Sequence, residues 1–241
     1  MFLCGGYGKI SLPLSRIFIP NTMAKEVKID TYSEADLIEM FNLIRLEGNE
    51  EHFLMKEWVN TTPLQLSHEE AFLFEKISEE VTRKIAGWKE ETLKMKFISF
   101  VLFLGNMVDN GKYSTYFEET ISATVEGHFL KTQTDFMVST GILNKPKKPF
   151  FHFQEYKKLK NPSGDPVAQL IEAFLIAQEK NKNGKPLYGC TVTGKYWEFF
   201  VIQDKTYCIS KSYDCTDREI LKVIIAILRK FVVILNERLL D

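Results

Sequence analysis

The stretch "FHFQEYKKL", residues 151–159, ends a run of aromatic residues with one acid and one base two positions apart. Side chains at alternate positions of a β-strand project to the same face. Glu155 and Lys157 therefore share a face, with Phe151 and Phe153 behind them on the same side. The aromatic run predicts a buried strand, and the charged pair marks the end of that strand as a candidate functional position.

The residues after this strand predict a helix and then a second strand. "NPSGDPVAQLIEAFLIAQEKN", residues 161–181, has Asp165 in the N-cap position and Pro166 at the first helical position. "PLYGCTVTG", residues 186–194, has the β-branched and aromatic composition of a strand. A strand–helix–strand crossover between residues 150 and 193 predicts a parallel pair within a mixed sheet that helices cover.

The rest of the chain supplies more strands and a helical region. "YFEETISATVEGHFLKTQTDFMVST", residues 116–140, predicts two strands joined around Glu126-Gly127, and residues 196–210 predict a further hairpin. Capping signals open three helices, at 33–36, at 67–70 and at 216–219, and another amphipathic stretch covers 89–108. We therefore expect an α/β protein with a helical part over 31–110 and a core over 111–241 that closes with a long helix. Residues 1–30 are expected to be a loosely ordered extension, with Met23 as a possible start.

Composition is that of a soluble globular protein, with 241 residues, 45% hydrophobic and 26% charged. Four cysteines without metal-ligand spacing favour reduced thiols and a cytoplasmic location. The apolar C-terminal segment has Val223–Leu228 as its longest charge-free run, far short of the ~20 residues that span a bilayer. It predicts a helix that is buried or that faces a partner, rather than a membrane anchor.

A formal net charge of −1 gives the whole chain no attraction for nucleic acid. Residues 145–160 nevertheless carry six lysines and the single acid Glu155, a local excess of +5. Such a cluster is either a solvated lysine loop or a surface for backbone phosphates.

A second acid lies on the strand before Glu155. Asp135 is the only acid in "FLKTQTDFMVST", residues 129–140. Two carboxylates on neighbouring strands can share a divalent cation, and a lysine beside them can orient water for attack on a phosphodiester. The spacing alone is weak, because Glu-x-Lys also occurs at Glu26–Lys28, and a solvent-facing ion pair is the plain alternative.

These residues resemble the PD-(D/E)XK nuclease superfamily, which has the restriction-endonuclease-like fold. "TDF" supplies Asp135, "EYK" supplies Glu155 and Lys157, and "DPVAQLIEA" supplies Gln169 on the following helix. The resemblance covers roughly residues 115–210, and "PLYGCTVTGKYWEFFVI" is similar to the nuclease domains of type I restriction subunits. Thr134 stands where some members have proline.

The resemblance implies a magnesium-dependent nuclease acting on DNA, with manganese as a substitute. Asp135, Glu155 and the backbone carbonyl of Tyr156 would hold the metal, and Lys157 would position the attacking water. Gln169 either assists this water or is an ordinary surface glutamine. Members often add a further glutamate near the metal, and the sequence leaves five candidates open: Glu70, Glu75, Glu118, Glu119 and Glu126.

Nucleic acid contacts follow from the same interpretation. The lysines expected to bind backbone phosphates are Lys145, Lys147, Lys148, Lys158 and Lys160. Tyr156, Trp197 and Phe199 either stack on bases or belong to the core, and strand aromatics favour the core.

Two other interpretations stay open. The first is a catalytically inactive module of the same fold, for binding or assembly in a defence or mobile-element system, which contacts a partner or a second copy through its C-terminal helix. The second is an α/β protein in which the motif residues occur by chance.

Overall fold

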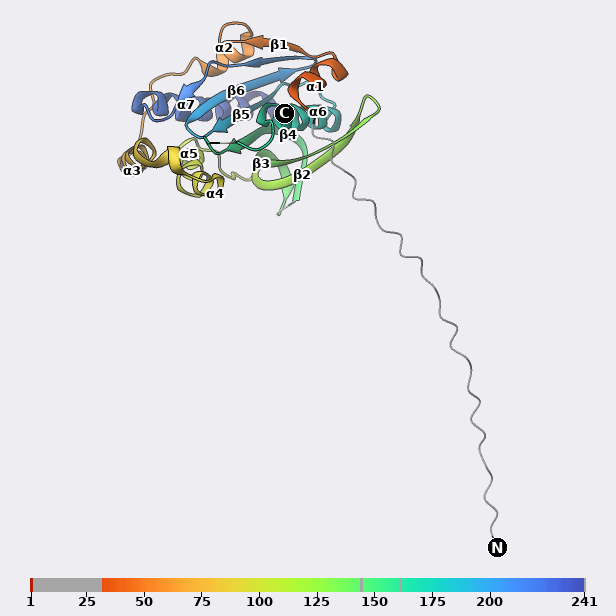
Figure 1. Cartoon of the computed structure of the whole chain (residues 1–241), viewed down its shortest axis with the longest axis horizontal. Coiled ribbons are helices and arrows are strands. Elements are labelled where there is room, and N and C mark those ends of the chain that lie inside the picture. The colour runs from red at the N-terminus through yellow and green to blue at the C-terminus, as the bar shows by residue number, and fades with distance from the viewer. Residues whose placement is uncertain (2–31, 144, 161, 241) are drawn as a thin grey trace. The chain divides into compact units, whose positions relative to one another are not determined.

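The computed structural model describes Met1 and residues 32–143, 145–160 and 162–240, so the extension expected over 1–30 lies almost wholly outside the described residues. Residues 32–240 form one α/β unit around an eight-stranded mixed sheet (Figure 1). The order along the sheet is β1-β7-β6-β5-β4-β3-β2, and β8 pairs with β6. The strands are β1 (Ile44–Glu47), β2 (Ser114–Val125), β3 (His128–Ile142), β4 (Lys145–Lys157), β5 (Leu187–Thr193), β6 (Tyr196–Gln203), β7 (Thr206–Ile209) and β8 (Tyr213–Asp214).

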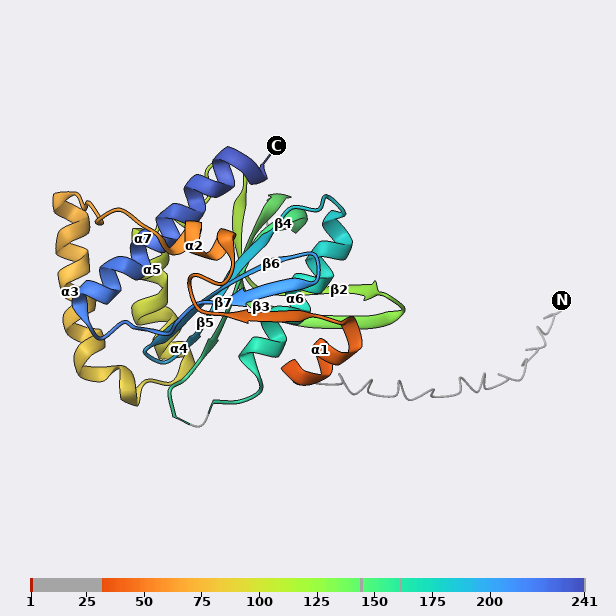
Figure 2. The ribbon, with the colours of Figure 1, turned by 90° about the horizontal axis from the view of Figure 1, so that it is seen from above.

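Helices cover both faces of this sheet. The α-helices are α1 (Glu34–Phe41), α2 (Phe53–Val59), α3 (His68–Lys84), α4 (Glu90–Leu93), α5 (Ser99–Leu104), α6 (Pro166–Asn181) and α7 (Arg218–Ile234). A 3-10 turn η1 (Ile85–Gly87) follows α3, and π-helical turns η2 (Lys94–Ile98) and η3 (Leu235–Leu239) join α4 to α5 and extend α7. In Figure 2, α3, α5 and α7 gather on the left, while α1 and α6 lie toward the right.

Two apolar cores lie between the sheet and the helices, one on each face. One packs α2, α3, α5 and α7 against a sheet face that carries Phe136, Tyr156, Tyr188 and Phe199. The other packs α1 and α6 against the opposite face, which carries Met137, Phe153 and Phe200. Neighbouring residues along a strand point to opposite faces of the sheet. In the central strands both faces carry apolar side chains, as expected for a sheet that helices cover on both sides.

The predicted crossover is confirmed. β4 and β5 are parallel, with His152 paired to Tyr188 and Lys157 to Thr193, and α6 connects them. Asp165 caps α6, because its side chain accepts hydrogen bonds from the N–H groups of Val167 and Ala168. The predicted hairpin around Glu126-Gly127 is also present, with Val125 paired to His128.

Residues 32–110 are mostly helical, but they also contain a strand. β1 runs parallel to β7, with Ile44 paired to Thr206. The sequence pattern places Ile44 on the first helix, whereas that helix ends at Phe41 because Asn42 adopts a left-handed conformation with φ of 52°. The partner of β1 is far away in sequence, and this long-range pairing turns four residues into a strand.

The C-terminal helix is buried rather than free to face a partner. Its apolar stripe, from Leu221 through Phe231 to Ile234, belongs to the core against the sheet. Val233 is the single large apolar residue of α7 that is exposed among the residues described. Within the described ranges, no helix has the length and apolar character that crossing a membrane requires.

Candidate active site

The two acids of the motif meet where β3 and β4 separate. Phe136 pairs with Gln154, but the next backbone N–H, that of Tyr156, donates to the Asp135 carboxylate at 2.6 Å. The Asp135 carboxylate thus accepts a hydrogen bond that a backbone carbonyl would accept in a regular strand pair. The contact fixes Asp135 against the residue that lies between Glu155 and Lys157.

Glu155 and Lys157 form a buried ion pair on this strand. The Lys157 Nζ to Glu155 Oε1 distance is 2.7 Å, and the two residues are only 8% and 4% exposed. Both project to the face that α6 covers, as Phe153 does. A solvent-facing ion pair, the alternative interpretation of this spacing, is therefore wrong.

A third carboxylate comes from β2. Phe117 pairs with Phe136 and Glu119 with Thr134, and Glu118 between them adopts a φ of 55°. Positive φ is uncommon in a residue other than glycine and is frequent at functional sites. Glu118 and Asp135 also contact the same ammonium group, that of Lys94. Glu118 is therefore the candidate glutamate that this shared contact links to Asp135.

Lys94 is the residue that sequence analysis did not identify. Its ammonium group lies 2.7 Å from Asp135, 2.8 Å from Glu118 and 3.3 Å from Glu90. The spacing of Glu90 and Lys94, four positions apart in an expected helix, predicts only a local ion pair. Packing of the helical part on the sheet brings both residues to β3, and no local pattern signals that contact.

The site carries more acid than base. Four carboxyl groups, from Glu90, Glu118, Asp135 and Glu155, face the ammonium groups of Lys94 and Lys157. When the four carboxyl groups and both ammonium groups are ionised, the site has a net charge of −2. One divalent cation would offset this charge.

The electrostatics of the site reflect this crowding. Burial and repulsion from Asp135 raise the pKa of Glu155 to about 7, and the Lys157 ammonium only partly opposes them. Burial also raises the pKa of Asp135, against hydrogen bonds from Lys94 and Tyr156. Burial by itself lowers the pKa of Lys94, but hydrogen bonds to Asp135 and Glu118 outweigh it and hold that pKa above its ordinary value.

The donor set suits magnesium, although the described residues hold no cluster of three His, Cys, Asp or Glu side chains arranged for a metal ion. Magnesium is commonly held by one or two carboxylates, together with water and substrate phosphate. Asp135, Glu155 and the carbonyl of Tyr156 are oxygen donors of this kind. Lys94 and the Tyr156 N–H occupy one lone pair on each Asp135 oxygen, and each oxygen retains a second.

Gln169 lies near the same site. It lines a cavity of about 440 Å³ together with Lys157, and its Oε1 atom is buried without a hydrogen-bond partner in the described part of the chain. Gln169 is half-buried with its amide oxygen covered, and it lines the same cavity as Lys157.

The other candidate glutamates have partners elsewhere. Glu70 pairs with Arg229 at 2.6 Å, Glu75 pairs with Arg218, and Glu126 pairs with Lys205. Glu119 is half-buried on β2, beside Glu118.

The lysines of residues 145–160 lie in two groups, one at each end of β4. Lys158 and Lys160 follow Lys157 directly, at the end of β4 that carries the site. Lys147 pairs with Thr140, and at ~3.4 Å per strand residue the span from Asp135 to Thr140 is roughly 17 Å. Lys145, Lys147 and Lys148 are exposed at the opposite end of β4, because the segment is a long strand rather than a loop.

The strand aromatics belong to the core. Tyr156, Trp197 and Phe199 are at most 1% exposed, so they are not available to stack on bases. His152 is also buried, between Trp58 and Phe231, and burial lowers its pKa to about 3. It is therefore a neutral core histidine.

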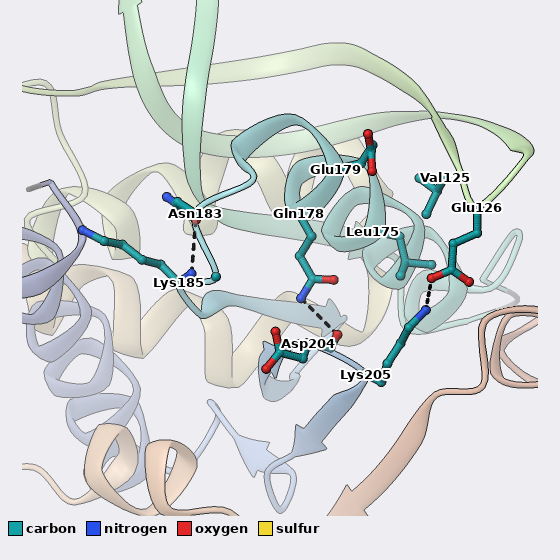
Figure 3. A pocket seen from close by; sticks show the side chains of 10 residues that line it. Val125, Glu126, Leu175, Gln178, Glu179, Asn183, Lys185, Asp204 and Lys205 are labelled. Atoms are coloured by element: carbon teal, nitrogen blue, oxygen red, sulfur yellow. Dashed lines mark hydrogen bonds and ion pairs between the residues drawn. The ribbon is translucent and has the colours of Figure 1, made fainter.

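A second cavity, of about 290 Å³, lies between α6 and the turns after β2 and β6 (Figure 3). Several of its polar groups have protein partners. Lys205 pairs with Glu126, and Gln178 donates to the Asp204 carbonyl at 3.1 Å. We do not assign it a function.

The sequence matches no protein-family model, and comparison with curated proteins gives no significant match. The functional argument therefore depends on the geometry of the site.

Proposed function

We propose that this protein is a metal-dependent nuclease of the PD-(D/E)XK type, with a restriction-endonuclease-like core, that hydrolyses phosphodiester bonds of DNA. The observation that carries the proposal is the contact of the Asp135 carboxylate with the backbone N–H of Tyr156, between the paired Glu155 and Lys157, followed by the α6 crossover. The order β2, β3, β4, α6, β5 supports this type of core, because it joins an antiparallel meander to a parallel strand through one helix.

The residues of the site divide the chemical work. Asp135, Glu155 and the Tyr156 carbonyl would hold Mg²⁺, with Mn²⁺ as a substitute. When bound, the metal would lower the pKa of a coordinated water and offset charge on the phosphate. Lys157, held at 2.7 Å by Glu155, orients the attacking water and stabilises negative charge on the phosphate oxygens.

Binding of the substrate depends on local charge. Lys158 and Lys160 lie beside the site and would neutralise phosphates next to the scissile bond. Cleavage would leave a 5′-phosphate and a 3′-hydroxyl, as the resemblance implies.

The experiment is a cleavage assay on single- and double-stranded DNA with Mg²⁺, with Mn²⁺ and with EDTA. We expect cleavage that requires metal and falls at least ~100-fold in Glu155→Ala and Lys157→Ala, in line with the loss of a catalytic group. Glu119→Gln is the matched control, since it removes a half-buried carboxylate one position from Glu118. Activity that survives both site substitutions would show that the assignment is wrong.

One observation favours the catalytically inactive module as a second candidate. The Lys94 ammonium already offsets charge on Asp135, Glu118 and Glu90. A magnesium titration followed by thermal unfolding separates the two functions. A stabilisation by Mg²⁺ that disappears in Asp135→Asn supports the nuclease, whereas no response to Mg²⁺ together with a stable oligomer supports the module.

A further inference from the structure

The cavity beside Lys157 has features of a ligand site that the proposed chemistry does not use. Its volume of about 440 Å³ is in the range of small-molecule pockets, roughly 300–1,000 Å³. Lys157 contributes one wall, the segment before α6 and the first turns of that helix contribute another, and Tyr32 and Ser33 at the start of α1 close it. The cavity therefore adjoins the place where the scissile phosphate would bind.

Two oxygen-bearing side chains from consecutive turns of α6 line this cavity, and the described residues give their oxygens no hydrogen-bond partner. The Oε1 atom of Gln169 is buried, and no donor in the described chain reaches it. Glu172 is 7% exposed, and the described residues form no hydrogen bond or ion pair with its carboxyl group. Burying polar groups without partners is costly, so this pair is better explained by a ligand than by folding.

The ligand must donate hydrogen bonds. The carboxylate of Glu172 and the amide oxygen of Gln169 together offer three acceptor oxygens. Burial raises the pKa of Glu172 to about 7, and N–H groups that donate to this carboxyl group would favour its ionised form. The pair therefore suits N–H groups of a neutral ligand.

A nucleobase has this chemistry. The Watson–Crick edge of guanine presents two adjacent donors, N1–H and one N2–H, beside the O6 acceptor, whereas thymine presents a single N–H donor. Enzymes read an unstacked base by hydrogen bonds to this edge and by stacking on an aromatic side chain. The half-buried ring of Tyr32 lines the cavity and provides such a stacking surface.

We infer that this cavity is a subsite for an unstacked guanine base next to the scissile phosphate, with Glu172 and Gln169 accepting from its Watson–Crick edge and Tyr32 stacking on it. The inference rests on the proposed function for the position of the substrate strand. It implies that the protein prefers guanine at one position and acts on single-stranded or locally opened DNA.

The test is calorimetric titration of the full chain with the four 2′-deoxynucleoside 5′-monophosphates, in EDTA so that no metal contributes. We expect the guanine nucleotide to bind at least about tenfold more tightly than the thymine nucleotide, as for a good bidentate base contact. Glu172→Gln should remove most of that difference while leaving the affinity for the thymine nucleotide unchanged. Tyr32→Leu should weaken the binding of all four nucleotides by a similar factor.

Glu179→Gln is the control, because it removes a carboxylate from the same helix outside this cavity. Equal affinity for the four nucleotides, no binding of any of them, or guanine preference that persists in Glu172→Gln would each overturn the inference. Failure of the proposed function gives a different experimental result from failure of the subsite. A protein that binds guanine selectively but never cleaves DNA has the subsite without the nuclease, and one that cleaves without base preference has the nuclease without the subsite.

Discussion

Lys94 is the residue of the site that no local sequence pattern identifies. Its ammonium group contacts the carboxylates of Glu90, Glu118 and Asp135, and its side chain is 15% exposed. In Lys94→Met these carboxylates lose their shared cation. We expect the free energy of unfolding in EDTA to fall by roughly 3 kcal/mol, as when one partner of a largely buried ion pair is removed.

Urea denaturation with and without Mg²⁺ checks this prediction. Magnesium should stabilise the variant more than the wild type, because the variant retains more uncompensated negative charge. Lys84→Met is the control, since Lys84 and Glu80 form an exposed pair of the same spacing, worth only about 0.2–0.5 kcal/mol. Equal effects of the two substitutions would show that Lys94 does not hold the acids together.

Glu172 gives a prediction about pH. Its pKa is about 7 in the folded protein, above its ordinary value of 4.5, because the carboxyl group is buried. The folded state therefore binds the proton more tightly, and stability declines as pH rises from about 4.5 to 7. In Glu172→Gln we expect this decline to be smaller by roughly 1–3 kcal/mol.

The measurement is urea denaturation at pH 5, 6, 7 and 8. Glu179→Gln on the same helix should keep the pH dependence of the wild type, because Glu179 is partly exposed and pairs with Lys182. A Glu172→Gln profile parallel to that of the wild type would contradict the assignment of a buried, unpaired carboxyl group.

At the scale of elements, the N-cap residue of α6, Asp165, contacts both α6 and α1 and lines the cavity beside Lys157. Asp165 accepts hydrogen bonds from Val167, from Ala168 and from the N–H of Glu34 in α1. Among the described residues, Asp217 caps α7 through the N–H groups of Glu219 and Ile220 only. We expect Asp165→Ala to lower the melting temperature more than Asp217→Ala does, with costs near 2 and about 1 kcal/mol. Circular dichroism melts check the order, and a larger effect at Asp217 would contradict it.

Elements with strong local signals could be predicted from the sequence. The capping boxes of α1 and α3, the Asp-Pro start of α6 and the turn at Glu126-Gly127 each satisfy a local rule, and each is present. The shared face of Glu155 and Lys157 follows from strand alternation in the same way.

Features that depend on long-range contacts could not be predicted. β1 becomes a strand only through its pairing with β7, and the positive φ of Glu118 arises where β2 passes Asp135. Lys94 reaches the site through the packing of the helical part on the sheet. None of these contacts leaves a periodic pattern in the sequence.

At the scale of the whole molecule, the lysines form two separate groups along β4. Lys158 and Lys160 adjoin the site, whereas Lys145, Lys147 and Lys148 lie at the other end of β4, with Lys147 roughly 17 Å away, a span of about five base pairs. Alanine substitution of Lys158 and Lys160 should weaken binding to DNA of every length and reduce the salt slope by about one per lysine. Substitution of the distant three should weaken binding only to longer substrates.

Salt titrations with a six-nucleotide strand and a twenty-base-pair duplex separate these effects. If the distant lysines matter equally for both substrates, the strand geometry given for β4 is wrong. If neither group affects binding, the protein does not contact nucleic acid through this strand.

The central claim is that Asp135 and Glu155 hold one divalent cation beside Lys157, and the most direct measurement is anomalous diffraction from crystals of the full chain soaked in Mn²⁺. The account predicts one strong peak about 2.1–2.2 Å from a carboxylate oxygen of each residue, close to the range for oxygen ligands of such cations. A peak elsewhere, or none at saturating Mn²⁺, would contradict it.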